Sequence, residues 1–83
     1  MNLATLTLTP TLTLTLTLTQ AIADYSAALR VEPRNAYAFY NRGITYDRMG
    51  DYASAVDDFT CAIGIDDSNA DFFHNRGFRC GQP

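Results

Sequence analysis

Two helices and the turn between them are encoded in residues 36–65, which read AYAFYNRGITYDRMGDYASAVDDFTCAIGI. Apolar residues recur in both halves at the spacing of one helix face. In the first half they are Tyr37, Phe39, Tyr40, Ile44, Tyr46 and Met49. In the second half they are Tyr52, Ala55, Val56, Phe59, Ala62, Ile63 and Ile65. Gly50 and Asp51 stand between the halves as a helix stop and an N-cap, so the pattern predicts an antiparallel helical hairpin.

Gly43 lies inside the first helix and needs a packing reason, because glycine there costs about 1 kcal/mol relative to alanine. We expect Gly43 and Ala55 to leave room for a close approach of the two helices. The rings of Phe39, Tyr46 and Phe59 would then fill the space around these small residues. This close approach is the main structural prediction from the sequence.

The chain contains an internal repeat. Aligning residues 21–49 with residues 55–83 gives nine identical pairs out of 29. The first members of these pairs are Ala21, Asp24, Ala28, Asn35, Ala36, Phe39, Asn41, Arg42 and Gly43. The hairpin is therefore preceded by a copy of its second helix and followed by a copy of its first. We predict four helices, at about residues 20–31, 36–49, 52–65 and 70–79, with Asn69 capping the last.

A period of about 34 residues with this content resembles the tetratricopeptide repeat (TPR) family. The motifs that carry the resemblance are Phe39-x2-Arg42-Gly43-x2-Tyr46 and Ala55-x3-Phe59-x2-Ala62. Further members of the pattern are Ala21, Tyr25, Ala28, Pro33, Phe73 and Gly77. The departures are Arg42 and Arg76 in place of leucine, Asp67 in place of proline and Cys80 in place of tyrosine. The resemblance implies an all-α fold of antiparallel helix hairpins, a fragment of a right-handed TPR-type α-solenoid.

The expected organisation is a low-complexity segment at residues 1–19, a partial TPR domain at residues 20–80 and a tail at residues 81–83. The domain holds one full repeat, residues 36–69, with half a repeat on each side. Because each hairpin needs neighbours to cover its core, we expect apolar surface to be uncovered at both ends.

Residues 5–19 alternate threonine and leucine, apart from Pro10. Strict alternation is typical of an amphipathic strand, so we expect this segment to be extended or otherwise non-helical. A signal peptide is disfavoured because the first positive charge is Arg30, and a membrane span because half of the run is threonine. Two interpretations stay open: a structural role, or a translated hexanucleotide DNA repeat over residues 3–19.

The chain has six arginines, no lysine and a net charge of −3, which argues against binding to nucleic acid or to an anionic membrane. Cys61 and Cys80 lack CxxC spacing, and His74 is the single histidine, so a zinc finger with paired histidines is excluded. The adjacent carboxylates at 57–58 and 66–67 are expected on the solvated surface. We therefore expect no cofactor, no metal and no catalysis.

The resemblance to TPR proteins implies a concave groove that is lined by the first helices and binds an extended peptide or a partner helix. The implied groove residues are Tyr37, Tyr40, Asn41, Ile44, Asp47, Arg48, His74 and Asn75, with Asp71 and Phe78 beside them. Asn41 and Asn75 could bond a peptide backbone, or they could bond neighbouring helices and water. Tyr40 and Asp71 occupy positions where a groove for a terminal carboxylate would carry cations, so that chemistry is disfavoured.

The sequence thus predicts a non-catalytic module that binds a protein or peptide, without nucleic-acid or membrane partners. Self-association through the uncovered repeat ends is a further expectation. The alternative is a truncated or degenerate fragment with no independent function. Free thiols and no export signal make a cytoplasmic setting the default, with the nucleus as the alternative.

Overall fold

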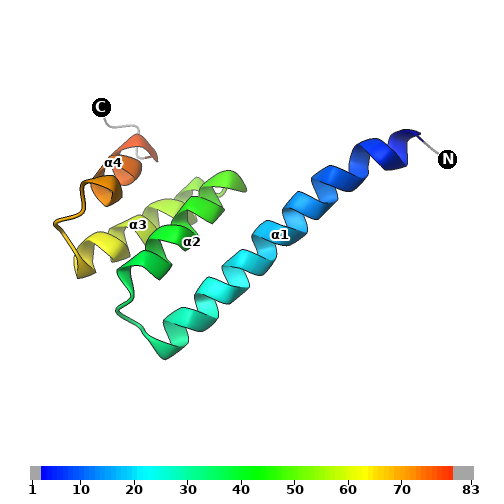
Figure 1. Cartoon of the computed structure of the whole chain (residues 1–83). Helices are drawn as coiled ribbons and strands as arrows, with labels where there is room; N and C mark the ends of the chain where they lie inside the picture. The colour runs from blue at the N-terminus through cyan, green and yellow to red at the C-terminus, as the bar shows by residue number, and fades with distance from the viewer. Residues whose placement is uncertain (1–2, 80–83) are drawn as a thin grey trace.

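The computed structural model describes the backbone of residues 3–79 and the side chains of residues 13–77. In this part of the chain there are four helices and no strand: α1 (Leu3–Val31), α2 (Ala36–Arg48), α3 (Tyr52–Ile65) and α4 (Ala70–Arg79). Each helix packs against the next one along the chain, so α1 and α4 lie at opposite ends of the stack (Figure 1). The predicted all-α fold of helix hairpins is confirmed. Cys80, the tail at 81–83 and the side chain of Phe78 lie outside the described part.

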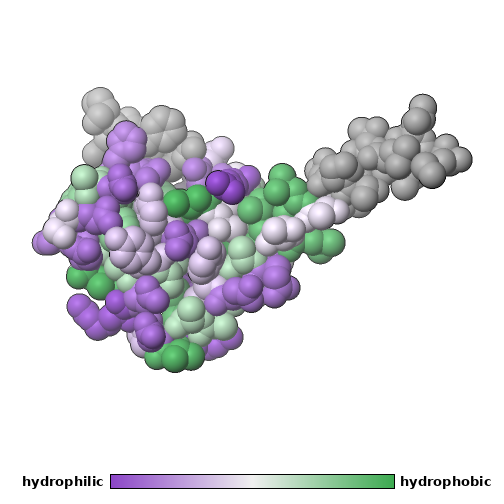
Figure 2. All heavy atoms as spheres, in the orientation of Figure 1, coloured by the Kyte–Doolittle hydropathy of each residue, from purple (hydrophilic) through white to green (hydrophobic). Residues whose placement is uncertain are grey.

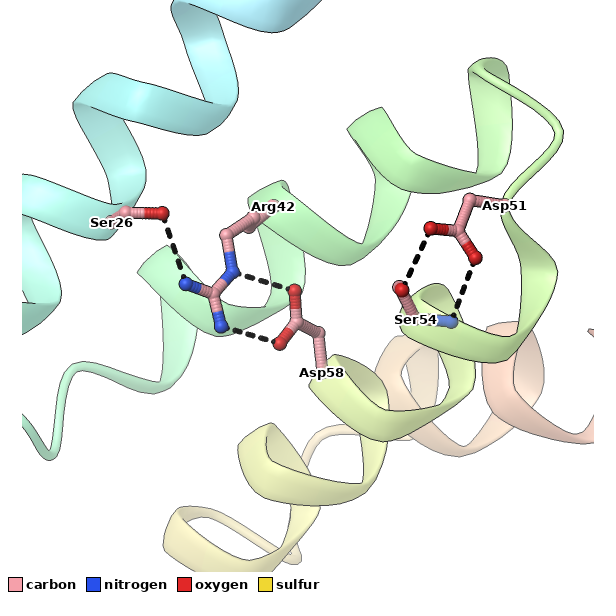
Figure 3. Close-up of polar contacts among 5 residues, drawn as sticks. All are labelled: Ser26, Arg42, Asp51, Ser54 and Asp58. Carbon is pink, nitrogen blue, oxygen red and sulfur yellow. Dashed lines mark hydrogen bonds and ion pairs between the residues drawn. The ribbon is translucent and has the colours of Figure 1, made fainter.

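The last three helices each begin at a capping side chain. Asn35 caps α2 by accepting a hydrogen bond of 3.0 Å from a backbone N–H one turn later. Asp51 caps α3, where it accepts hydrogen bonds from the Ser54 N–H at 3.2 Å and the Ser54 hydroxyl at 2.8 Å (Figure 3). At the start of α4, Asn69 accepts a hydrogen bond of 2.9 Å from the Asp71 N–H. These local bonds fix where each helix starts, because they satisfy N–H groups that have no partner inside the helix.

The chain reverses between α2 and α3 at Gly50. Its φ of +83° lies in the left-handed region, which glycine enters without steric penalty. The N–H groups of Gly50 and Asp51 bond back to the carbonyls of Asp47 and Tyr46, at 3.0 and 2.9 Å. The turn therefore closes the last carbonyls of α2 and directs α3 back alongside it.

The two helices of this hairpin touch most closely at Gly43. A Cβ atom added there would lie 2.7 Å from Cε1 of Phe59 and 3.2 Å from the carbonyl oxygen of Ala55. Ala55 and Phe59 are 0% and 1% exposed. The Phe59 ring thus occupies the space that any side chain at Gly43 would need.

A second set of buried residues joins α2, α3 and α4. Ala36, Ala62 and Phe72 form its centre, and the Tyr40 ring packs beside them. The Tyr40 ring centroid lies 4.7 Å from that of Phe72 and 5.7 Å from that of Phe59. Stacked and tilted ring pairs at these distances stabilise a core beyond their buried area.

The threonine–leucine run is helical, so the prediction of an extended or non-helical segment is wrong for residues 3–19. The run continues the helix of residues 20–31, and each added residue except Pro10, which has no N–H, can gain a backbone hydrogen bond once a helix exists. A lone strand would leave its backbone groups without partners. Thr17 and Thr19 also donate their hydroxyls to the carbonyls of Thr13 and Thr15, each at 2.9 Å. Threonine side chains are thereby accommodated within the helix.

The repeat register explains why no turn interrupts α1. One period before Gly50 and Asp51 stand Leu16 and Thr17. Leucine avoids the positive φ that the turn requires. The Thr17 hydroxyl bonds to the preceding turn of the same helix instead of capping a new one. Helix α1 therefore continues through residues 16 and 17, the repeat positions that correspond to the turn after α2.

The alternating leucines of α1 do not share one side of the helix. Positions two apart on a helix differ by about 200° around its axis, so alternate residues spread over opposite sides. Leu14 and Leu16 are 59% and 70% exposed. Figure 2 shows hydrophobic spheres on α1 where it leaves the other helices, next to the part drawn in grey. Among the described helices, none has the length and apolar character to cross a membrane.

Candidate functional site

Helices α2 and α4 share one surface near the N-terminal half of α2. The Tyr37 ring meets the Phe72 ring edge-on at 5.6 Å, and Asn69 donates a hydrogen bond of 3.4 Å to the Tyr37 hydroxyl. One turn further along α2, Asn75 donates a hydrogen bond of 2.9 Å to the Tyr40 hydroxyl. Side-chain contacts at Tyr37 and at Tyr40 therefore connect the two helices.

The α2–α4 face is defined by the residues expected to line the groove: Tyr37, Tyr40, Asn41, Ile44, Asp47, Arg48, His74 and Asn75. Tyr37, Arg48 and His74 are exposed, and the other five are half-buried. The structure brings Tyr40 and Asn75 into contact across the two helices. The other α2 residues of the face lie further toward the C-terminus of α2, at helical spacing and beyond the Tyr37 and Tyr40 contacts: Asn41, Ile44, Asp47 and Arg48.

Two residues of this surface were missed by the reading of the sequence. Phe72 is fully buried, with Tyr37 and Tyr40 against it, although the repeat places it opposite the small residue Ala38. Asn69 was expected only as a cap, and its amide group also reaches Tyr37. No pattern in the sequence marks either contact, because both depend on how far apart the two helices lie.

The amide group of Asn75 is already engaged within the protein. Its Nδ2 donates to the Tyr40 hydroxyl and to the Asp71 carbonyl, both at 2.9 Å. An asparagine side chain has two N–H donors and one carbonyl acceptor. Both donors thus bond to groups of the protein itself, which agrees with the alternative that Asn75 bonds to neighbouring helices. The Oδ1 atom is left as an acceptor.

Tyr40 stays a neutral phenol that can donate its O–H. Burial raises its pKa above the usual value, and the nearby Asp71 carboxylate raises it further. The hydrogen bond from Asn75 acts in the opposite direction. Because Tyr40 accepts the hydrogen bond from Asn75, its hydroxyl proton is not used in that bond and can be donated to an external acceptor.

A partly buried ion pair lies on another side of α2. The Arg42 Nε and Nη2 atoms donate to the two carboxylate oxygens of Asp58, both at 2.7 Å, and Nη1 donates to the Ser26 hydroxyl at 3.1 Å (Figure 3). The guanidinium also lies over the Phe39 ring at 5.6 Å and the Tyr46 ring at 6.0 Å. Arg42 therefore connects α1, α2 and α3, and its bonds to Asp58 raise its pKa.

This pair corrects the expectation for the carboxylates at 57–58. Asp57 is exposed as expected, whereas Asp58 is only 4% exposed and pairs with Arg42. The signal for the pair was present in the repeat. Arg42 recurs as Arg76 and Asp58 is a repetition of Asp24, so opposite charges return at fixed repeat positions.

A hollow of about 340 Å³ lies beside the ion pair, and Cys61 is on its wall. Cys61 is an exposed residue, but partial burial of its thiol raises the pKa, and the Asp58 carboxylate raises it further while Arg42 lowers it. A thiol with a raised pKa is a poor nucleophile at neutral pH. The Cys61 thiol is therefore not an activated nucleophile at neutral pH.

Asp66 serves the turn between α3 and α4. Asp66 accepts hydrogen bonds from the Ser68 N–H and hydroxyl, at 3.1 and 2.6 Å, and these bonds lower its pKa. In the part of the chain with described side chains, no group of three histidine, cysteine or acidic residues is arranged to hold a metal ion.

The fold and its register define a class of protein, the α-solenoid of stacked helix hairpins. Comparison with protein families gives two matches: a TPR repeat at residues 17–50 and a tetratricopeptide repeat at residues 36–69. Together they span residues 17–69, and the chain belongs to the tetratricopeptide repeat family. Repeats of this family are generally protein-interaction modules. The comparison with curated proteins gave no match.

Proposed function

We propose that the α2–α4 face binds an extended peptide or a short helix of a partner protein, without catalysis. The observation that supports this most is the 2.9 Å hydrogen bond between Asn75 and the Tyr40 hydroxyl. It holds an aromatic and an amide side chain from two helices in one arrangement before any ligand arrives. Side chains that are already ordered lose little conformational entropy on binding.

The groups on this face suit a peptide backbone. The Tyr40 hydroxyl offers a donor and the Asn75 Oδ1 atom an acceptor, which match a backbone C=O and N–H. The amide of Asn41 adds one more of each further along α2. The Tyr37 ring, 59% exposed, adds apolar contact area that costs little entropy to order.

The charges on the face favour a ligand of mixed charge. Arg48 is exposed on the last turn of α2 and would pair with an acidic side chain of the ligand. Asp71 lies close enough to Tyr40 to raise its pKa, and it would repel a terminal carboxylate at that end. The ligand is therefore an internal segment of a partner and not its carboxyl terminus.

The test begins with peptides selected from a random display library on the immobilised chain. Binding of the selected peptides is then measured by calorimetry for the wild type, Asn41→Ala and Tyr40→Phe, with circular dichroism to check helicity. We expect Asn41→Ala to weaken binding by about tenfold, the usual effect of leaving a polar ligand group unpaired. Tyr40→Phe removes the hydroxyl and should weaken it by about threefold to tenfold.

The matched control is Thr60→Ala, which changes an exposed residue of α3. It should leave the affinity unchanged. Equal affinities for the wild type, Asn41→Ala and Tyr40→Phe would contradict the proposal. So would a loss of binding in Thr60→Ala that matches the loss in Asn41→Ala.

A further inference from the structure

Among the described helices, α1 and α4 each lack the hairpin partner that α2 and α3 provide for one another. In the register of the repeat, residues 21–31 of α1 correspond to α3, and α4 corresponds to α2. The pair α2 and α3 forms a closed hairpin, whereas α1 and α4 lie at opposite ends of the stack (Figure 1). Helix α1 has the pattern of a second helix and α4 that of a first helix.

The unmatched side of α1 is visible in the exposure of its residues. Ala21 and Tyr25 are half-buried and Asp24 is exposed, while their counterparts on α3, Ala55, Phe59 and Asp58, are all buried. A hollow of about 510 Å³ lies along this side, lined by Thr13, Leu16, Thr17, Gln20, Ala21 and Asp24. Two of its residues, Ala21 and Asp24, are the counterparts of Ala55 and Asp58, which contact α2 at Gly43 and Arg42.

On α4, the side that corresponds to the α3-facing side of α2 has open space at Gly77. A Cβ atom added at Gly77 would meet nothing within 4 Å, although its counterpart Gly43 is filled by the Phe59 ring. Arg76 lies over the Phe73 ring at 5.5 Å, as Arg42 lies over Phe39. Arg42 has its carboxylate within the hairpin, and no carboxylate is paired with Arg76 among residues 13–77.

We propose that α4 of one copy docks on α1 of a second copy of this chain. Arg76 then pairs with Asp24 of the second copy, as Arg42 pairs with Asp58. The ring of Tyr25 of the second copy enters the open space at Gly77, as Phe59 does at Gly43. The two half-repeats form one hairpin across two chains.

The surfaces of α1 and α4 are complementary to each other, so the partner that fits both is a second copy of this chain. The cation of α4 and the carboxylate of α1 are complementary in charge and occupy the register positions that already pair within the chain. The open space at Gly77 and the half-buried Tyr25 correspond to Gly43 and Phe59, which pack together within the chain. Because the two surfaces differ and lie at opposite ends, the contact is head-to-tail, and it extends into open chains of molecules.

The test is sedimentation velocity of the full chain over about a hundredfold range of concentration, because mass action makes association depend on concentration. The wild type should form dimers and longer chains as concentration rises. Arg76→Asp and Asp24→Arg each place like charges opposite one another and should weaken association by about tenfold or more. The double variant Arg76→Asp/Asp24→Arg restores an opposite pair and should associate within about threefold of the wild type.

A matched pair of glycines tests the shape of the contact. Gly77→Gln fills the open space on α4 and should abolish association. Gly64→Gln makes the same change on α3, where a side chain also meets nothing within 4 Å, and should leave association unchanged. Both variants should keep or gain helicity, because glutamine forms helices better than glycine.

Three outcomes would overturn the proposal. A chain that stays monomeric throughout the range would mean that the ends take a different helix. Association that persists in Arg76→Asp and in Gly77→Gln would mean that another surface carries it. A double charge-reversal variant as weak as the single ones would mean that the pair is not formed. These variants leave the α2–α4 face intact, so they separate this proposal from that of peptide binding.

Discussion

Helices α1 and α3 carry the same pattern of residues and differ in what covers them. Ala55 and Phe59 of α3 are fully buried against α2, whereas Ala21 and Tyr25 at the same repeat positions of α1 are half-buried. The sequence pattern decides which side of a helix is apolar, and the neighbouring helix decides whether that side is buried. Substitutions at matched positions of α1 and α3 therefore separate the contribution of the neighbour from that of the residue type.

The largest contrast is expected for the paired aromatic residues. Phe59→Ala empties the space at Gly43 and should lower the free energy of unfolding by about 3–5 kcal/mol. Tyr25→Ala should lower it by about 1 kcal/mol, since that ring is already partly in water. Urea unfolding followed by circular dichroism measures both values. Similar losses for the two variants would show that α1 is covered as fully as α3.

The next contrast concerns the carboxylates at the same two positions. Asp58→Asn leaves Arg42 without its ionic partner and should lower the free energy of unfolding by about 2 kcal/mol, less than for a fully buried pair because the arginine side chain is 20% exposed. Asp24→Asn should change it by less than about 0.5 kcal/mol in the monomer. Unfolding at low protein concentration measures both. A small loss for Asp58→Asn would show that the pair contributes little.

The two glycines of α2 and α4 should respond with opposite signs. Gly43→Ala places a methyl group against the Phe59 ring and should destabilise the chain by about 1–3 kcal/mol, despite its better helix propensity. Gly77→Ala meets open space and should stabilise it by up to about 1 kcal/mol. Thermal unfolding of the two variants measures the difference. A gain in stability for Gly43→Ala would show that the helices can separate at no cost.

The smallest effect concerns the pH dependence of a thiol on α3. Burial and Asp58 raise the pKa of Cys61, so its thiolate fraction at pH 8 is lower than that of a free cysteine. Alkylation of the Cys80→Ser variant should therefore be slower than that of a cysteine peptide at pH 8, and the two rates should approach each other at higher pH. Unfolding in urea should remove the difference. Equal rates in the folded state would contradict a raised pKa of the Cys61 thiol.

Much of the helical arrangement was predictable because its signals are local. The bounds predicted for α2, α3 and α4 agree with the structure to within one residue, since Asn35, Asp51 and Asn69 act as caps and Gly50 forces the turn. The family followed from an internal repeat that returns small and aromatic residues to fixed positions. Capping and periodicity act within a few residues, and a sequence displays them directly.

The conformation of the threonine–leucine run could not be obtained in the same way. Its period of two is a strand signal when the segment is considered alone. The run is joined to a helix and has no strand to pair with among the described elements, so the context outweighs the pattern. The available signal that the helix continues was the absence of a turn sequence: Leu16 and Thr17 stand where the repeat has Gly50 and the cap Asp51.

The candidate site was predictable only as a set of residues on one side of α2 and α4. That the Asn75 donors are used by Tyr40 and Asp71 depends on the distance between two helices, which spacing along the chain does not give. The Arg42–Asp58 pair was missed because arginine replaces a leucine of the family pattern and Asp58 resembled a solvated acid. A pair of opposite charges whose members both recur one repeat away is the signal that would have found it.

The continuity of α1 through Leu16 has a consequence for length variation of the gene product. Each additional threonine–leucine pair would extend the rod by about 3 Å and would leave every contact of residues 20–79 in place. Insertions and deletions of whole pairs therefore leave the packing of residues 20–79 unchanged. Chains whose threonine–leucine runs differ in length would have the same free energy of unfolding for these residues. A single glycine–aspartate pair in place of residues 16 and 17 would end that tolerance, because the run would then bend back at a fixed point and its length would begin to matter.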